Sequence, residues 1–234
     1  MKDWHSASIE EVFSKLGTGR EGLESEEAEK RLEKEGMNEI KSDEEVSPLK
    51  IFVSQFQDFL IYLLLAAALL SVGIGFLPGQ SPQLREATLI AGILFANGVF
   101  GFIQDYKAEK SIEAFKNLST PEATVIRDGK KVNIDASEVV PGDVIMLDQG
   151  DAVPADARII EQSSLSTDES ALTGESTNVE KQAGTKAEDV PVAEMQNMVF
   201  KNTSVVKGRG KAVVVETGMD TEVGSIASQI ESAE

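Results

Sequence analysis

The feature that most constrains this chain is a pair of long apolar runs in its first half. Residues 59–77 (FLIYLLLAAALLSVGIGFL) hold no charged residue over 19 positions, and residues 87–103 are uncharged over 17. About 20 apolar residues in a helix cross the ~30 Å hydrocarbon core of a bilayer, so both runs are candidate membrane spans. A buried hairpin of a large soluble protein is the alternative, but the first run is too long and too continuously apolar to favour it.

The short link between the runs predicts a helical hairpin. Residues 78–86 (PGQSPQLRE) are rich in turn formers, which places both flanks on one side of the membrane. The link carries one basic residue, Arg85, whereas four lysines lie beyond the outer ends of the runs, at Lys50, Lys107, Lys110 and Lys116. The positive-inside rule therefore predicts an integral membrane protein with both termini in the cytoplasm.

The charged flanks exclude several classes of ligand. Asp and Glu outnumber Lys and Arg by 40 to 22, which disfavours nucleic acid as a partner because phosphate contacts need basic side chains. The chain has no cysteine, so it forms no disulfide and no thiolate metal site. The single histidine, His5, lies near the N-terminus, where we expect a frayed chain and no function. Residues 1–25 are acidic and lack the apolar core of a signal peptide.

Short helices are expected before and after the apolar runs. Residues 8–15 place Ile9, Val12, Phe13 and Leu16 on one face. A second helix is predicted from about Ser25, as N-cap, to Glu35, with Gly36 as its stop. After the second run, residues 104–118 continue a helical pattern into water as a stalk.

From residue 123 the pattern changes to short strands. Asp128-Gly129 separates two β-rich runs and is a strong hairpin signal. Four more strands (VIMLD, ARIIE, MVFKNTSVV and KAVVVET) are predicted between turns that include residues 207–210 (KGRG). Strands of this length and spacing favour a sandwich or jelly roll over a parallel sheet. A last helix over residues 221–230 is predicted, capped by Asp220 or Thr221.

Three strings of residues point to a family. They are PGD at 141–143 with GDAVPAD at 150–156, DESALTGES at 168–176, and NMVF at 197–200 followed by Thr203, ETG at 216–218 and TEVG at 221–224. A lone Thr-Gly-Glu-Ser is usually only a turn. In this order, behind two candidate spans, the strings resemble the actuator domain of the P-type cation-transporting ATPases. The pattern LSTDESAL at 165–172 is most similar to their type II, calcium-pump-like branch.

The resemblance covers essentially the whole chain and implies its fold. The expected architecture is a membrane α-helical hairpin plus a cytoplasmic, mostly-β actuator domain, a distorted jelly roll with short N-terminal helices. Residues 1–46 would hold the N-terminal helices, residues 47–118 the hairpin and stalk, residues 119–220 the β domain, and residues 221–234 a helix leading toward a third span. The cell membrane is the expected location.

The resemblance also implies the site. In the family, an aspartate of a separate domain takes the γ-phosphoryl group of ATP, and a Thr-Gly-Glu-Ser loop positions the water that hydrolyses the resulting acyl phosphate. Here that loop is Thr173, Gly174, Glu175 and Ser176. A carboxylate at the tip of a tight turn can aim water at phosphorus, so Glu175 is the expected catalytic group. Gly174 would let the backbone approach, and Thr173 and Ser176 would brace the turn.

Neighbouring residues are expected to be structural. Turn-bracing is the favoured role for Asp143, Asp151 and Asp156, while Asp168 and Glu169 would cap or orient the loop. Two departures from the family pattern stand out. Residues 177–179 (TNV) replace a frequent Pro-Val, which predicts lower rigidity, and Asn202 replaces a usual glycine at a position that Asn tolerates in the left-handed region. In the second run, Gly92, Ala96, Gly98 and Gly101 would allow close packing, and Asn97 a helix–helix hydrogen bond or an ion path.

The sequence contains no Asp-Lys-Thr-Gly-Thr phosphorylation motif. We therefore expect no cofactor or metal site here; ATP and magnesium would serve the complete pump. Expected partners are the lipid bilayer, the phosphorylation and nucleotide-binding domains of the pump, and the transported cation. Two functions stay open: the N-terminal part of an ATP-driven, calcium-type pump, inactive alone, or a non-catalytic membrane protein that reuses the actuator fold as a regulator or assembly partner.

Overall fold

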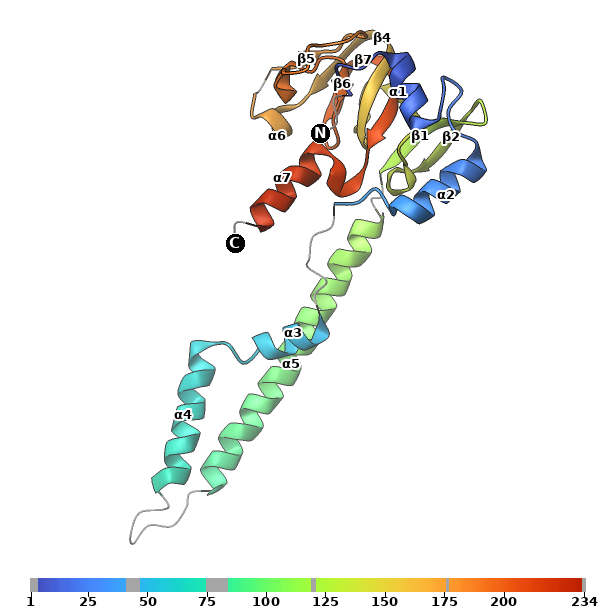
Figure 1. The fold of residues 1–234 in the computed structure, drawn as a ribbon. Helices are drawn as coiled ribbons and strands as arrows, with labels where there is room; N and C mark the ends of the chain where they lie inside the picture. Colours follow the sequence, from blue (N-terminus) through green and yellow to red (C-terminus); the bar gives the residue numbers. More distant parts are fainter. Residues whose placement is uncertain (1–3, 41–46, 75–83, 119–120, 176, 233–234) are drawn as a thin grey trace. The chain divides into compact units, whose positions relative to one another are not determined.

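The computed structural model describes residues 4–40, 47–74, 84–118, 121–175 and 177–232. They divide into two compact units: a helical unit within residues 42–119 and a β unit made of residues 1–41 together with 120–234. The β unit is therefore discontinuous in sequence, because the helical unit is inserted between its N-terminal helices and its first strand (Figure 1).

Three helices form the helical unit: α3 (Pro48–Ser54), α4 (Phe59–Ile74) and α5 (Leu84–Leu118). Among the described residues, only α5 is by itself long and apolar enough to cross a membrane, and its candidate span is residues 87–112. Helices α3 and α4 reach that length only as one span bent by 65°. The predicted second span thus continues unbroken into the predicted stalk. Residues 75–83, with most of the predicted link, lie outside the described residues.

Two glycines of α5 face the break between α3 and α4. A Cβ atom at Gly98 would lie 2.6 Å from Cζ of Phe56, and one at Gly101 would lie 2.2 Å from Oε1 of Gln55. Both glycines therefore permit a close approach of chain segments, as predicted. At Gly92 a Cβ atom would meet no described atom within 4 Å, so close packing at this glycine stays a prediction.

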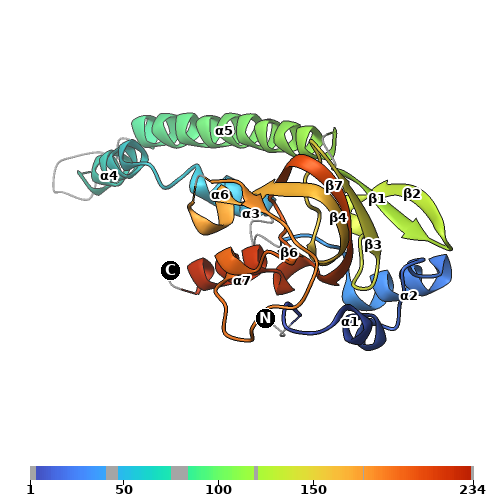
Figure 2. The same cartoon turned by 90° about the horizontal axis from the view of Figure 1, so that it is seen from above.

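One antiparallel sheet organises the β unit. Its strand order is β2-β1-β3-β7-β4-β5, and β6 pairs with β4. Figure 2 shows the two longest strands running side by side and bending strongly. The strands are β1 (Glu122–Arg127), β2 (Lys130–Asp135), β3 (Val144–Asp148), β4 (Asp156–Asp168), β5 (Val179–Glu180), β6 (Met198–Val199) and β7 (Ser204–Glu216). The predicted mostly-β, non-parallel class is confirmed.

Strand β7 corrects two predictions. Residues 207–210 do not form a turn, because β7 runs through them. Gly208 instead crosses the backbone of β4 at a register shift, where a Cβ atom would lie 2.2 Å from the carbonyl oxygen of Ser164. The predicted strand MVFKNTSVV is split into β6 and the start of β7, because Asn202 turns the chain between them in the left-handed region (φ 64°).

Two local predictions are confirmed. Residues 128–129 join β1 to β2 as a two-residue loop, in which Asp128 (φ 51°) and Gly129 (φ 70°) both adopt the positive φ that a type I′ turn requires. The C-terminal helix α7 (Glu222–Glu231) is capped by Thr221, whose Oγ1 accepts a hydrogen bond from the N–H of Gly224 (3.1 Å).

The N-terminal helices belong to the β unit. Helix α1 (Ile9–Leu16) starts with a capping box between Ser8 and Glu11, and its Val12 is buried in a cluster with residues of β3 and β7. Helix α2 (Ser25–Glu35) packs through Ala28 against Leu23 and Val140. Ser25 is the first helical residue rather than the N-cap, because Asp128 of the β1–β2 turn accepts its N–H and caps the helix from outside.

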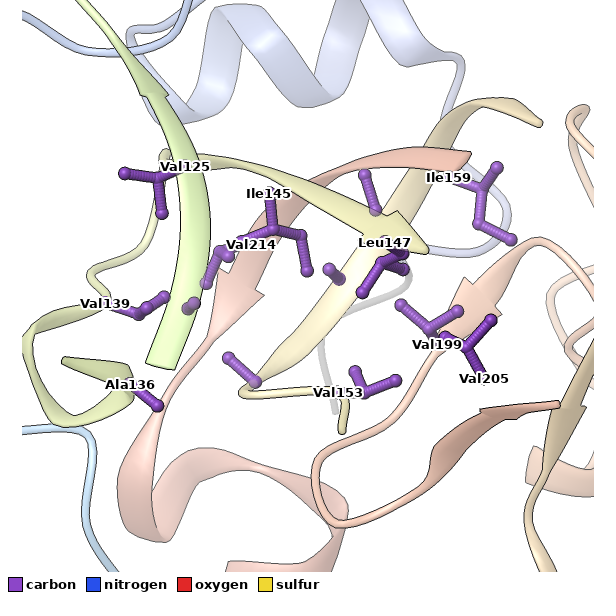
Figure 3. Packing of buried hydrophobic residues seen from close by; sticks show 14 of the residues in the cluster. Val125, Ala136, Val139, Ile145, Leu147, Val153, Ile159, Val199, Val205 and Val214 are labelled. Carbon is purple, nitrogen blue, oxygen red and sulfur yellow. The ribbon is translucent and has the colours of Figure 1, made fainter. Parts of the chain in front are cut away.

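His5 corrects another prediction, since it is buried rather than frayed. Its Nε2 lies 3.0 Å from the carbonyl oxygen of Glu188, and its own carbonyl accepts hydrogen bonds from Nδ2 of Asn197 (2.7 Å) and the N–H of Lys186 (3.0 Å). The hydrophobic core includes the buried side chains of Val125, Ile145 and Val214, which come from β1, β3 and β7 (Figure 3). It holds β4, the strand that leads into the Thr-Gly-Glu-Ser loop.

Candidate functional site

The Thr-Gly-Glu-Ser loop projects between β4 and β5. Strand β5 turns back onto β4, with Ser166 paired to Glu180 and Thr167 to Val179. The N–H of Lys181 then donates to the carbonyl oxygen of Leu165 (2.9 Å) and completes the stem. Residues 169–178 are therefore a loop whose two ends are held together at the sheet.

A single helical turn, α6 (Ser170–Thr173), forms the first half of the loop. The N–H groups of Leu172 and Thr173 both donate to the carbonyl oxygen of Glu169 (2.9 Å each), and the N–H of Gly174 donates to Ser170 (3.0 Å). Gly174 ends the turn in the left-handed region (φ 76°), where a Cβ atom would meet no described atom within 4 Å. The backbone conformation, rather than a lack of space, is what favours glycine there.

Glu175 follows at the tip and is exposed. Its N–H donates to Oγ1 of Thr173 (3.3 Å), and that hydroxyl donates to the carbonyl oxygen of Glu169 (3.1 Å). Thr173 therefore links the tip of the loop to its base. Among the described residues no hydrogen bond or ion pair is made by the carboxylate of Glu175. Ser176, the fourth predicted site residue, lies outside the described residues.

The two acids before α6 point in different directions. Oδ1 of Asp168 accepts a hydrogen bond from the N–H of Ser170 (3.0 Å), and hydrogen bonds from Ser170 lower the pKa of this half-buried residue. The side chain of Glu169 is turned inward and is only 1% exposed. Its Oε1 accepts a hydrogen bond from Oγ1 of Thr167 (2.8 Å) and forms an ion pair with Lys181.

Lys181 is the residue of this region that sequence reasoning did not single out. Its side chain is fully buried, and its ammonium lies 5.4 Å from the centroid of the Phe200 ring. Burial lowers the pKa of Lys181, and the charge of Glu169 opposes that shift. A lysine that follows a two-residue strand carries no sequence signal of burial. Its pairing depends on β5 folding back onto β4.

The three other acids have structural roles. Asp143 is buried and accepts hydrogen bonds from both Nε and Nη2 of Arg127 (2.9 and 2.7 Å). Asp151 braces its own turn by accepting the N–H of Asp148 (2.8 Å). Asp156 does more than brace a turn, because it accepts the N–H groups of Lys201 and Glu222 (2.8 Å each) and so joins β4 to two distant segments. Burial raises the pKa of Asp156 to about 6 despite these hydrogen bonds.

A cleft of the β unit lies elsewhere. It has a volume of about 800 Å³ and is lined by α1, α2 and the end of β7. Its central cation, Arg31, is already engaged by Glu27 and by the carbonyl oxygens of Leu16 and Pro141. Among the described residues no group of three or more His, Asp or Glu side chains is arranged to hold a metal ion.

Comparison with known proteins addresses the same regions. Residues 117–231 match the P-type ATPase actuator domain, and residues 4–71 match the N-terminus of the cation transporter/ATPase family. Similar relatives include calcium-transporting ATPases of Bacillus subtilis (44% identical over 92% of this chain), Listeria monocytogenes (42% over 97%) and Arabidopsis thaliana (an endoplasmic reticulum-type protein, 39% over 96%). Sodium/potassium exporting P-type ATPases of Saccharomyces cerevisiae are 35% identical over 97% of it.

The chain spans about a quarter of the length of these relatives: 23%, 25% and 22% of the three calcium-transporting proteins. Both family matches fall on the segments that build the β unit, and the second also includes α3 and most of α4. The predicted resemblance is confirmed. The chain belongs to the P-type ATPase family, of which it carries the cation-transporter N-terminal region and the actuator domain.

Proposed function

We propose that this chain is the N-terminal part of an ATP-driven cation pump, in which Glu175 positions water to hydrolyse an aspartyl-phosphate intermediate. One observation carries the proposal. The carboxylate of Glu175 is exposed at the tip of a turn whose hydrogen bonds run back to Thr173 and Glu169. Such a group is held in place by its own loop and has its oxygens free for an external partner.

The chemistry follows from that placement. A carboxylate that accepts a hydrogen bond from water orients it and takes up its proton as the oxygen attacks phosphorus. Gly174 adds no side chain beside the approaching phosphoryl group. Thr173 holds the N–H of Glu175, and Asp168 holds the start of α6, so the turn has a support at each end. We place Ser176 in the same loop as a bracing residue.

A calcium-type pump is the favoured form, because the relatives with the highest identities cited above are calcium-transporting. The phosphorylation and nucleotide-binding domains, with ATP and magnesium, would come from the rest of the pump. The residues described here would be inactive alone. The transported cation, the bilayer and those domains are the partners that we propose, and a distorted jelly roll is the form that we propose for the β unit.

The helical unit supports a place in the membrane. Helix α4 has no buried residue, and its large apolar side chains face outward, with Phe59 80% and Leu69 73% exposed. An apolar surface of that extent is stable in lipid rather than in water. We therefore propose that α4 and α5 are the two spans of a hairpin in the cell membrane with both termini in the cytoplasm.

Replacing Glu175 by Gln in the complete pump tests the function. The amide keeps the size of the side chain but removes the charge that accepts the proton. Phosphorylation from ATP uses groups in another domain, so the phosphoenzyme should still form. Its decay after an ATP chase should slow by about 10²–10⁴-fold, the usual contribution of a positioned general base.

Glu180→Gln is the matched control, because Glu180 is also exposed and lies in β5 at the stem of the same loop. The phosphoenzyme of the Glu180→Gln pump should decay at the same rate as that of the unmodified pump. Normal decay in the Glu175→Gln pump would show that the loop is only a structural turn, and the proposed function would then be wrong.

A further inference from the structure

We infer that the buried ion pair between Glu169 and Lys181 positions the loop that carries Glu175, which makes Lys181 a positioning residue for dephosphorylation. The inference rests on the function proposed above. It concerns the one ion pair among the described residues whose two side chains are both almost completely buried, 1% and 0% exposed.

Glu169 controls the first half of the loop. Its carbonyl oxygen accepts hydrogen bonds from the N–H groups of Leu172 and Thr173 and from Oγ1 of Thr173. Thr173 in turn holds the N–H of Glu175. A displacement of Glu169 is therefore passed to the tip through one helical turn and one hydroxyl group.

Lys181 controls the second half. It follows β5, which has only two residues paired with β4 and so gives the stem little support of its own. The ammonium of Lys181 reaches back to Glu169, so that the pair joins the residue at the start of α6 to the residue at the end of β5. The pair therefore holds together the two ends of the loop that carries Glu175.

In the part of the chain that the structure describes, neither charge has a second ion-pair partner, although Thr167 also donates a hydrogen bond to Glu169. Among the described residues, Oε2 of Glu169 has no hydrogen bond, and the ammonium of Lys181 has no polar partner besides Glu169. A buried charge that loses its partner must become neutral or move toward water. Either change would shift the base of the loop. If both charges are removed together, no unpaired charge remains in the interior. Replacing a buried ion pair by uncharged side chains of similar size is often tolerated.

The test uses Lys181→Met, Glu169→Gln and the double variant. Lys181→Met keeps the length of the side chain and its contact with Phe200 while removing the charge. Lys211→Met is the matched control, because Lys211 pairs with Glu161 in the same sheet but is exposed to solvent. An exposed pair contributes little to stability, so this control should behave like the unmodified protein.

The first measurement is hydrogen exchange in the chain itself, at the N–H groups of Thr173 and Gly174. Both are bonded within α6, and their exchange should accelerate by about tenfold or more in Lys181→Met, because the base of the turn is released. The double variant should return toward the unmodified rate. Exchange that is unchanged in Lys181→Met would overturn the inference whatever the function of the loop.

The second measurement is phosphoenzyme decay in the complete pump. Lys181→Met should slow decay by about 10²-fold, the effect expected when a catalytic group is misplaced by about 1 Å, while formation from ATP is retained. A general loss of folding would lower the rates of both formation and decay of the phosphoenzyme. Slow decay with normal formation therefore identifies a positioning effect. Partial recovery in the double variant would support the pair itself.

The outcomes separate the two proposals. Slow decay in Glu175→Gln with normal decay in Lys181→Met would overturn the pair and leave the function standing. Normal decay in both would overturn the function. If Lys181→Met does not fold, Glu169→Gln is compared with the double variant, and equal decay rates in these two would overturn the inference.

Discussion

Two of the buried carboxylates in the β unit are compensated in different ways. Glu169, beneath the functional loop, is compensated by the charge of Lys181. Asp156, at the start of β4, is compensated by the backbone N–H groups of Lys201 and Glu222. Asn38 lies beside this second site and binds both Lys201 and the loop before α7.

The difference concerns what each arrangement stabilises. The network around Asn38 and Asp156 consists of bonds to the backbones of four separate segments, so it ties the fold together. The pair at Glu169 connects the two ends of one loop. We therefore expect changes in the Asn38 network to lower the free energy of unfolding of the whole β unit, and changes in the loop to alter mainly local order and dephosphorylation.

The largest effect is expected from Asn38→Ala. The side chain donates to Ala136 and Pro154 (2.9 Å each) and accepts from Gly218 and Lys201 (2.9 and 2.8 Å). Losing these four hydrogen bonds, of which two are fully buried and two are partly buried, should lower the free energy of unfolding by about 4 kcal/mol. Denaturant unfolding followed by the fluorescence of the single tryptophan, Trp4, which is buried in the β unit, measures it.

Thr173→Ala is the counterpart in the loop. Two hydrogen bonds of a partly exposed hydroxyl are lost there, and the free energy of unfolding should fall by less than about 1 kcal/mol. Equal losses in the Asn38 and Thr173 variants would remove the distinction between the two places.

The next effect is a dependence on pH of opposite sign at the two places. The folded pKa of Asp156, about 6, lies above its unfolded value, so the folded state binds the extra proton. Its contribution is most favourable below pH 4 and falls as pH rises to 6. Lowering the pH from 7 to 4 should therefore stabilise the unmodified protein by about 2 kcal/mol relative to Asp156→Asn.

Asp168, beside the loop, should behave in the reverse way. Hydrogen bonds from Ser170 lower its folded pKa, so its stabilising contribution is present above the unfolded pKa and is lost as the pH falls through the folded value. Unfolding curves for Asp156→Asn and Asp168→Asn, measured from pH 7 to below pH 4, should diverge from the unmodified protein in opposite directions. Parallel curves for either variant would contradict the assigned cause.

The smallest effect concerns turn conformation. Gly174→Ala should cost about 1 kcal/mol, because a positive φ is unfavourable for alanine while space is available for its Cβ atom. Gly174→Asn should cost less, since Asn202 already occupies the same region of φ in the turn before β7. An equal cost for both substitutions, measured by denaturant unfolding, would show that crowding rather than φ governs the position.

Local chemistry could be predicted from the sequence. The turn at Asp128-Gly129, the Thr221 cap and the positive φ of Asn202 are each decided by residues within a few positions of one another. The loop of Glu175 is predicted by the resemblance of its motif to the family, and that motif consists of consecutive residues.

Pairings between distant segments could not be predicted. From the sequence, Lys181 would be assigned to the surface, but the pairing of β5 with β4 buries it. Gly208 would be assigned to a turn, but it lies against the backbone of Ser164. His5 reads as a terminal residue until Asn197 and Lys186 meet its carbonyl group. In each case a partner far away in the sequence decides the role, and periodicity carries no information about that partner.

The discontinuity of the β unit has a consequence for biosynthesis. Helix α1 leaves the ribosome about 200 residues before β7, against which Val12 is buried. At a synthesis rate of about 5–20 residues per second, its apolar face stays uncovered for roughly 10–40 s. The apolar helices of the inserted unit emerge in that interval. If α4 and α5 enter the membrane as proposed above, their insertion begins before the β unit can close. A chaperone that shields α1 and α2 during this delay would then raise the yield of folded protein.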